Sequence, residues 1–308
     1  MKKVLITGAG GFVGSHTVKA ALRDSDWEVH AVVSGRHRHI FPPKIIVHTL
    51  DLFESGSCEE LIKDARPDIL IHLAWSLDES GYSASDSNLL WVESSLRLLR
   101  MFYRYGGHRF LFVGSASEYG ELSGRSSEYA LSVQRSVYGE SKLAFEMICK
   151  RFCERNSYEF VSVRCFPVYG EGDGREFKAV GAAIAAFLRG EHFVCKGPNN
   201  VWDYVYVEDA ANALVRIAQS QYCGIVNVGT GRPHLMRDVF MQIAEKMDSQ
   251  TLLSFGDDLE HITISVADPT ILDQEIGYRC QINFSEGLDR TIAWWKTHNN
   301  NTFGGKKV

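Results

Sequence analysis

The chain has 308 residues, 45% of them hydrophobic, which is enough for one large domain or two coupled lobes. Lysine and arginine total 33 against 38 acidic residues, and no long basic run suggests a face that binds nucleic acid. No apolar stretch approaches the roughly 20 residues that span a membrane. No signal peptide precedes the first strand, so we expect a cytoplasmic protein. The seven scattered cysteines are expected to be reduced thiols, and we expect no metal site.

The first predicted strand, 4–7, leads into a turn with three glycines and then into a helix predicted over 13–23. Gly8 can adopt the backbone angles of a strand-to-helix turn, Gly11 leaves room for a phosphate, and Gly14 permits close packing of the helix. Phosphates bind well at a helix N-terminus, where free N–H groups and the helix dipole favour anions. The pattern predicts a dinucleotide cradle formed by Gly8, Gly11, Phe12, Val13 and Gly14.

Strands and amphipathic helices alternate through the first half of the chain, which predicts an α/β fold with a doubly wound parallel sheet. The further strands are predicted over 28–33, 45–50, 69–74, 110–113 and 160–165, and the helices over 58–65, 89–105 and 138–155. In such sheets ligands bind beyond the carboxyl ends of the strands, where Gly8, Asp51, Ala74 and Ser115 fall.

Tyr138 and Lys142 are four residues apart in the helix predicted over 138–155, so their side chains project from one face. A lysine cation favours the phenolate and lowers the pKa of a tyrosine from its ordinary value near ~10. Such a phenol can exchange a proton with a substrate oxygen, and Ser115 can hold the same oxygen. These residues are therefore the predicted catalytic trio. The alternative is that Tyr138 only packs on the helix and Lys142 is solvated.

The second half of the chain is less regular. We predict helices over 177–190 and 235–248, and short strands over 203–207 and 225–228 with a helix between them. Residues 297–308 are polar towards their end and are expected to form a disordered tail.

These motifs resemble those of the extended short-chain dehydrogenases/reductases, in the NAD(P)-dependent nucleotide-sugar epimerase/dehydratase/reductase superfamily. The resemblance extends from residue 3 to about 296 and includes the segments 51–52, 72–75, 164–170, 203–209 and 227–231. It implies a Rossmann-type domain over 1–165, with later returns near 203–228. It also implies a smaller C-terminal lobe over 166–296 that binds a nucleoside-diphosphate sugar. The further cofactor contacts that it implies are Asp51, Leu52, Leu73, Ala74, Tyr138, Lys142, Phe166 and Val168.

Departures from the family pattern narrow the expected activity. Dehydratases of the superfamily carry an Asp-Glu pair directly after the catalytic Thr or Ser, whereas this chain has Ala116 and Ser117. Water elimination is therefore poorly supported. We expect an NADPH-dependent reductase of a nucleotide-linked 4-keto-6-deoxy sugar, with Tyr138 as the proton donor. The alternatives are an NAD-dependent nucleotide-sugar 4-epimerase and a non-catalytic nucleotide sensor, and the intact trio argues against the sensor.

The end of the second predicted strand bears on the choice of cofactor. Members that prefer NAD usually carry an acid there to hold the ribose diol. This chain has Ser34, Arg36 and Arg38, which suit a 2′-phosphate better. NADP(H) is therefore favoured and NAD is the alternative. The other interpretation is that the two arginines belong to an ordinary solvated loop.

The substrate side departs from the family at two positions. An arginine often precedes the aspartate that stands here as Asp203, and this chain has Trp202 instead; the usual asparagine is Pro167. A diphosphate still needs cations, for which the candidates are Arg175, Lys178, Arg189 and Arg232. The expected substrate contacts are Trp75, Asp78, Ser115, Ser117, Pro167, Arg175, Trp202 and Arg232, with Glu79 beside Asp78.

The helices predicted over 89–105 and 138–155 suggest an oligomer. Leu96, Leu99 and Phe102 form one apolar stripe, and Leu143, Met147, Ile148 and Cys149 crowd the other helix. Such stripes can pair across a two-fold axis, so we expect a homodimer. The alternative is that the stripes pack inside one subunit.

Overall fold

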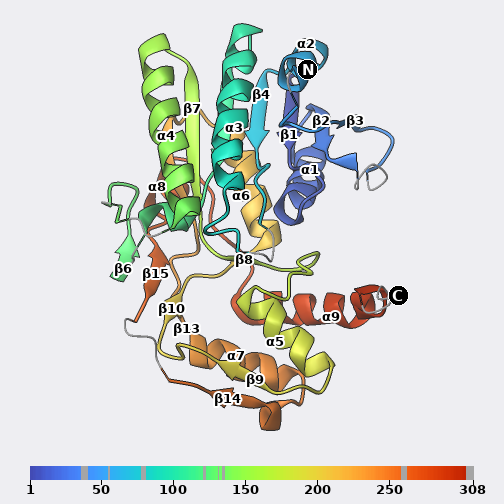
Figure 1. The fold of residues 1–308 in the computed structure, drawn as a ribbon, viewed down its shortest axis with the longest axis vertical. Coiled ribbons are helices and arrows are strands. Elements are labelled where there is room, and N and C mark those ends of the chain that lie inside the picture. The colour runs from blue at the N-terminus through green and yellow to red at the C-terminus, as the bar shows by residue number, and fades with distance from the viewer. Residues whose placement is uncertain are drawn as a thin grey trace.

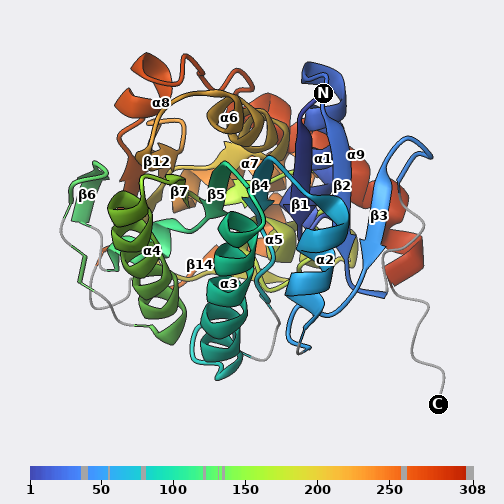
Figure 2. The ribbon, with the colours of Figure 1, turned by 90° about the horizontal axis from the view of Figure 1, so that it is seen from above.

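A computed structural model describes residues 1–35, 41–54, 56–77, 81–120, 123–130, 132–133, 136–257 and 262–302. Its centre is a seven-stranded parallel sheet in the order β12-β7-β5-β4-β1-β2-β3 (Figures 1 and 2). The order reverses between β1 and β4, as in a doubly wound fold. The strands are β1 (Lys3–Thr7), β2 (Glu28–Val33), β3 (Ile46–Thr49), β4 (Ile69–His72), β5 (Arg109–Val113), β7 (Glu159–Cys165) and β12 (Gly224–Val228). The predicted α/β fold class is confirmed.

Helices cover both faces of this sheet (Figure 2). One face carries α2 (Ser57–Ala65), α3 (Ser87–Arg104) and α4 (Val137–Asn156), and the other carries α1 (Phe12–Asp24) and α6 (Val207–Gln219). No helix within the described ranges is both long and apolar enough to cross a membrane.

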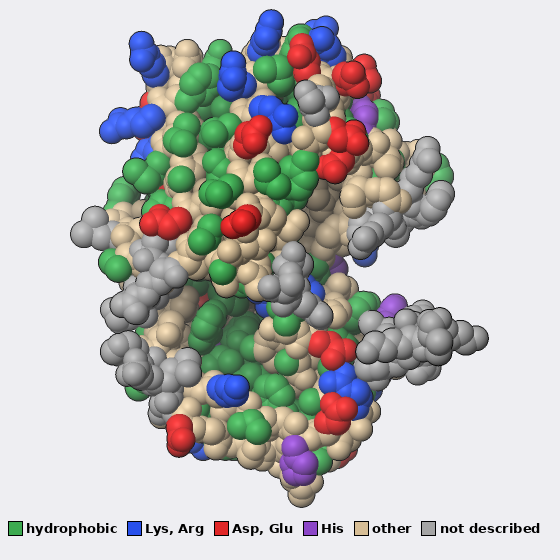
Figure 3. Space-filling model, in the orientation of Figure 1, with side chains coloured by type: hydrophobic (Ala, Val, Ile, Leu, Met, Phe, Trp, Pro, Cys, Tyr) green, Lys and Arg blue, Asp and Glu red, His purple; other side chains and the backbone are tan. Residues whose placement is uncertain are grey.

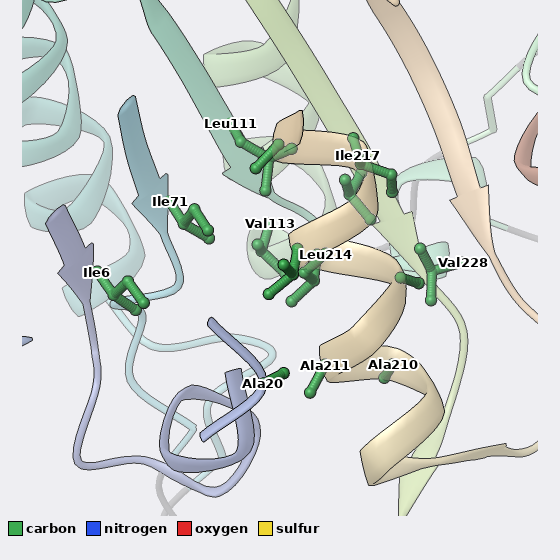
Figure 4. Close-up of a cluster of buried hydrophobic side chains, with 14 of the residues drawn as sticks. Ile6, Ala20, Ile71, Leu111, Val113, Ala210, Ala211, Leu214, Ile217 and Val228 are labelled. Atoms are coloured by element: carbon green, nitrogen blue, oxygen red, sulfur yellow. The ribbon is translucent and has the colours of Figure 1, made fainter. Parts of the chain in front are cut away.

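The core beneath α6 shows how the second half of the chain returns to the sheet (Figure 4). Leu214 and Ile217 of α6 are fully buried against Leu111 and Val113 of β5. Ala211 lies beside Ala20 of α1, and small residues at both positions let the two helices approach closely. Each buried Leu or Ile contributes about 1.5–3 kcal/mol, so this contact fixes α6 and β12 on the sheet.

Most of the remaining elements lie below the carboxyl edge of the sheet as Figure 1 is drawn, whereas α8 packs on β12 of the large sheet. A four-stranded sheet has the order β13-β10-β15-β6, and two further pairs join β11 with β8 and β14 with β9. The strands are β6 (Ser123–Ser126), β8 (Val168–Tyr169), β9 (Phe193–Cys195), β10 (Val201–Trp202), β11 (Val205–Tyr206), β13 (His234–Leu235), β14 (Leu253–Phe255) and β15 (Ile264–Ala267). The helices are η2 (Ala116–Tyr119), α5 (Ala179–Leu188), α7 (Met236–Lys246), η3 (Gln250–Leu252), α8 (Thr270–Gln274) and α9 (Phe284–Thr302).

Most boundaries differ from the sequence predictions by one or two residues, and two of the differences have a visible cause. The strand expected over 203–207 is reduced to Val205–Tyr206, because α6 already begins at Val207. The tail expected from 297 is helical as far as Thr302, since α9 continues through it. The ring of His298 stacks on Trp294 one turn earlier, which favours this continuation. Residues 303–308 lie outside the described residues.

The apolar stripes expected at a subunit interface mostly face the core instead. Leu99, Phe102 and Cys149 are buried against the sheet, because the 3.6-residue repeat marks the inward face of each helix. Met147 and Ile148 of the second stripe are exposed, and so are the apolar residues Leu89, Leu90, Val137 and Phe152 on the same two helices.

The tightest backbone contact gives a stability prediction. A Cβ at Gly14 would overlap the carbonyl oxygen of Gly8, so Gly14→Ala must push α1 away from the turn. We expect this change to lower the free energy of unfolding by about 1–3 kcal/mol in urea denaturation. Gly124→Ala is the control, because its Cβ would meet nothing within 4 Å, and it should stay within about 0.5 kcal/mol. Equal stability of Gly14→Ala and the wild type would contradict the prediction.

Candidate active site

The glycine turn after β1 forms a cradle that suits a phosphate group. Gly8 has a φ of +67°, and a Cβ there would lie 2.8 Å from the amide nitrogen of Ala74. Gly11 caps α1, and among the described residues no side chain caps this helix through a hydrogen bond. Phe12, Val13 and Gly14 open the helix without an acidic residue in the first turn. The N–H groups and the dipole of α1 therefore fit the pyrophosphate of a dinucleotide.

A buried histidine joins the ends of β1 and β4 beside this cradle. The Nδ1 atom of His72 lies 2.7 Å from the Thr7 hydroxyl, and its Nε2 atom lies 2.8 Å from the hydroxyl of Ser95 on α3. Burial lowers the pKa of His72 to about 3, so the ring is neutral. Thr7 also accepts the N–H of Ala74 at 3.3 Å, which fixes the segment 73–74 against the glycine turn.

The structure brings the predicted trio together. Ser115 follows β5, and its oxygen accepts the N–H of Ser117 at 3.1 Å. The Ser115 side chain is near enough to the Tyr138 phenol to act on its pKa, and Tyr138 is 7% exposed. Lys142 donates to the carbonyl of Val113 at 2.9 Å and lies 5.6 Å from the centre of the Tyr138 ring. A hydroxyl, a phenol and an ammonium thus converge at the carboxyl end of β5.

Burial dominates the electrostatics of the trio. It raises the pKa of Tyr138, and the Ser115 side chain acts in the opposite direction. The sequence predicts that Lys142 lowers the pKa of Tyr138. In this structure the net shift is upward, because a low-dielectric environment disfavours the charged phenolate. Burial also lowers the pKa of Lys142 to about 8, against the opposing effect of the Glu118 carboxylate.

Aromatic rings surround the Lys142 ammonium. It lies 4.4 Å from the ring of Trp75 and 4.9 Å from that of Phe112, within the range of cation–π attraction. Trp75 is held by a 2.9 Å hydrogen bond from its indole nitrogen to Asn88. Trp75, expected as a substrate contact, thus lies against the ammonium of Lys142. Its place directly after β4 was the only sequence signal for this contact.

Sequence reasoning missed Tyr82. Its ring meets Tyr138 edge-on at 5.1 Å, and the neighbouring Ser83 carbonyl accepts the N–H of Tyr138 at 3.0 Å. Lys178, which precedes α5, donates to the Tyr82 hydroxyl at 2.9 Å. The Lys178 ammonium, from the C-terminal half of the chain, is thus separated from the Tyr138 phenol by the ring of Tyr82.

The other candidate cations occupy different places. Arg175 pairs with Asp173 at 2.5 Å and lies 5.3 Å from the Phe12 ring, at the phosphate cradle. Arg189 pairs with Glu176 and Glu191 at 2.8 and 2.7 Å. Arg232 is exposed beyond the turn after β12.

That turn is held by Asp203, which is fully buried. Its carboxylate accepts the N–H groups of Gly231, Thr230 and Ala267 at 2.8, 3.0 and 3.2 Å. Trp202 lies on β10, where it pairs with His234 and Ser265. The carbonyl of Pro167 accepts the N–H of Val205 at 2.9 Å.

The remaining expected contacts line the same edge of the sheet. Asp51 is exposed after β3 and Leu52 is buried next to it, while Ser34 is exposed directly after β2. Leu73 and Ala74 follow β4, and Phe166 and Val168 follow β7. Ser117 is exposed within η2. Arg36, Arg38, Asp78 and Glu79 lie outside the described residues.

Comparisons with known proteins agree with this geometry. The family model described as NAD dependent epimerase/dehydratase family matches residues 4–229. UDP-glucuronic acid decarboxylase 1 of Xenopus tropicalis is 27% identical over 316 residues, which cover 96% of this chain and 72% of that protein.

Two solved structures are similar over 96% of this chain and 99% of their own. The UDP-glucose 4-epimerase of Thermus thermophilus, in complex with NAD, has a TM-score of 0.84 and 28% identity. The UDP-N-acetylglucosamine 4-epimerase of Methanobrevibacter ruminantium M1, in complex with UDP-N-acetylmuramic acid, has a TM-score of 0.86 and 26% identity.

The buried lysine predicts a pH dependence of stability. Lys142 has a pKa of about 8 in the folded protein, whereas an unfolded lysine titrates near ~10.4. Between these values only the unfolded chain holds the proton, so stability rises with pH by at most about 1.4 kcal/mol per unit. In urea denaturation from pH 7.5 to 10, the free energy of unfolding of the wild type should therefore rise relative to that of Lys142→Met, because the buried thiols, which act in the opposite direction, are common to both proteins.

Lys150→Met, which removes an exposed lysine from the same helix, is the matched control and should keep the wild-type slope. Parallel curves for the wild type and Lys142→Met would show that the ammonium is not buried as described.

Proposed function

The chain belongs to the NAD dependent epimerase/dehydratase family, and we propose that it is a nucleotide-sugar 4-epimerase that retains NAD through each turnover. The cluster of Ser115, Tyr138 and Lys142 beside a dinucleotide cradle carries this proposal. Two of the similar structures are 4-epimerases of UDP sugars, which favours epimerisation over the NADPH-dependent reduction expected from the sequence.

Residues 116 and 117 argue against a dehydratase. The positions after Ser115 hold Ala116, which is buried, and Ser117, which is exposed and carries no carboxyl group. Moving protons at C5 and C6 needs an acid–base pair near the sugar. The trio can instead serve reversible proton transfer at one hydroxyl, which is what epimerisation at C4 requires.

Each member of the trio has a distinct role in this proposal. Tyr138 removes the proton of the C4 hydroxyl and later returns it to the keto oxygen. Ser115 donates a hydrogen bond to that oxygen, since its own oxygen already accepts the N–H of Ser117. Lys142 stabilises the negative charge that develops nearby. Bound NAD supplies the hydride chemistry at C4.

NAD is the cofactor that we propose, held by the cradle of Gly8, Gly11 and Gly14. The family and the Thermus thermophilus complex favour NAD. The preference for NADP expected from Ser34 and Arg36 finds no support in these relatives. Mass spectrometry of the cofactor that co-purifies with the protein decides between the two.

We propose that residues 1–165, with the segment near 203–228, bind the cofactor, and that 166–296 bind the sugar nucleotide. Lys178 is the cation that we assign to the substrate in place of an arginine at position 202, because it lies beside Tyr82 and Tyr138. Arg232 and Trp202 are further substrate contacts in this proposal. Figure 3 shows a hollow between the part of the molecule that holds the large sheet and the part built from α5, α7 and α9.

The proton-transfer role of Tyr138 is tested directly. Tyr138→Phe should keep bound NAD but lower turnover of UDP-glucose to its 4-epimer by roughly 10²–10⁴-fold, the scale of one general acid–base. Tyr103→Phe is the matched control, because it removes a phenol that bonds to Glu159 at the opposite edge of the sheet. Turnover of Tyr138→Phe near the wild-type rate would rule out this role.

We also propose a homodimer through α3 and α4. A groove between these helices is lined by Leu89, Val92, Leu96, Val137 and Ala144. Figure 3 shows hydrophobic side chains on this face. Leu89 and Ile148 are 62% and 50% exposed, so a second copy would cover them at a four-helix interface.

Light scattering at micromolar concentration should give twice the chain mass of 34.6 kDa. Ile148→Glu should give the monomer, because it would bury a charge at the interface. Met241→Glu, at an exposed apolar position on α7, is the control and should remain dimeric. A monomeric wild type would refute the interface.

A further inference from the structure

We propose that Glu118 is a positioning residue for Ser115: its carboxylate holds the Ser115 backbone N–H and so fixes the hydroxyl against Tyr138. The inference rests on the proposed function, in which Ser115 holds the substrate oxygen. Glu118 lies in the motif that follows β5, and the assignment of Ser115, Tyr138 and Lys142 leaves its carboxylate without a role.

The hydrogen bonds around Ser115 are reciprocal. The Ser115 N–H donates to Oε1 of Glu118 at 2.7 Å, while the Ser115 hydroxyl oxygen accepts the N–H of Ser117 at 3.1 Å. The two bonds form a capping box on η2. The backbone N–H of Ser115 is thus held by the Glu118 side chain, and the Ser115 hydroxyl oxygen accepts one hydrogen bond from the backbone of η2. The hydroxyl proton stays available for donation on the side of Tyr138, whose phenol the Ser115 side chain influences.

The carboxylate of Glu118 is held from its other side by a buried ion-pair chain. The Nε atom of Arg164 lies 3.5 Å from Oε2 of Glu118. The same guanidinium bonds to Glu146 of α4 through Nη2 at 2.6 Å, and the Ser162 hydroxyl bonds to Glu146 at 2.7 Å. Glu118, Arg164 and Glu146 are each at most 3% exposed. These ion pairs link Glu118, through Arg164 and Glu146, to α4, the helix that carries Tyr138 and Lys142.

The backbone makes room for this carboxylate. A Cβ at Gly114 would overlap Oε1 of Glu118, so only glycine fits directly before Ser115. Burying a carboxylate costs free energy, and a second carboxylate nearby adds to that cost. Burial, with the neighbouring Glu146, raises the pKa of Glu118 to about 8. Apolar residues of similar volume often replace buried ion pairs without loss of stability. A contribution to the stability of the fold therefore does not account for a carboxyl group at position 118. Its hydrogen bond with the Ser115 N–H does.

Three variants separate the hydrogen bond from charge and packing. Glu118→Gln keeps an acceptor at the same reach, Glu118→Asp keeps the charge but withdraws it by one methylene, and Glu118→Leu removes the acceptor. The matched control is Glu128→Leu, because Glu128 is also buried and accepts one backbone N–H, that of Asn227 at 2.8 Å.

Two readouts are needed: amide hydrogen exchange at Ser115, which requires no substrate, and kcat and KM with UDP-glucose. We expect Glu118→Asp and Glu118→Leu to speed exchange at Ser115 about tenfold or more. Their kcat should fall by about 10²-fold with KM nearly unchanged, as for a misplaced catalytic group. Glu118→Gln should keep slow exchange and most of kcat, and Glu128→Leu should lose stability but keep kcat.

Wild-type exchange and kcat in Glu118→Asp would overturn the proposal even if Glu118→Leu does not fold. It would also be overturned if Glu118→Gln were as impaired as Glu118→Asp, because an acceptor kept at the same reach would then not be enough to preserve exchange protection and kcat. A wild type that does not turn over UDP-glucose, with Ser115 exchange responding as expected, would instead count against the proposed function and leave the positioning role intact.

Discussion

The ammonium of Lys142 is held between two strand ends, by the carbonyl of Val113 at the end of β5 and the ring of Trp75 after β4. Because Lys142 lies one helical turn beyond Tyr138, anchoring its ammonium also sets the direction of the phenol. The phenol then meets Ser115, which leaves the sheet two residues after Val113. The parallel order of the strands places this cluster at the same edge as the glycine turn that follows β1. Cofactor cradle and catalytic groups therefore share one surface.

Buried charge is concentrated directly beneath this surface. Lys142 and Arg164 lie close to Glu118 and Glu146, and all four side chains are shielded from water. Because water does not screen these four ionisable groups, a change in the charge of one of them strongly affects the other three. The same lack of water also explains why burial shifts the pKa values of Lys142 and Glu118 towards each other, to about 8 in both cases. The polar groups at the site are thus fixed before substrate arrives, which is what electrostatic stabilisation of a transition state requires.

Local patterns predicted the parts of the site that depend on neighbours in sequence. The glycine turn, the Tyr138–Lys142 spacing and Ser115 after a strand are of this kind, and so are the sheet and, to within two residues, most helix boundaries. Contacts between residues far apart in the sequence left no local pattern that could predict them. The ring of Tyr82 contacts Tyr138, and Lys178 donates a hydrogen bond to the Tyr82 hydroxyl. In the apolar stripes of α3 and α4, periodicity alone could not separate the residues that face the sheet (Leu99, Phe102, Cys149) from those that are exposed (Met147, Ile148). The expected preference for NADP rested on Ser34, Arg36 and Arg38, and the two arginines lie outside the described residues, so the structure gives no contact that bears on it.

The central claim is that the sugar is oxidised and then reduced again at C4 on one enzyme with its own NAD. The most direct measurement uses UDP-glucose that carries deuterium at C4, incubated with the purified protein and no added cofactor. The account predicts a 4-epimer that keeps its deuterium at C4, because the hydride leaves and returns within one active site. Loss of the label from C4, or conversion that begins only when NADPH is supplied, would contradict it.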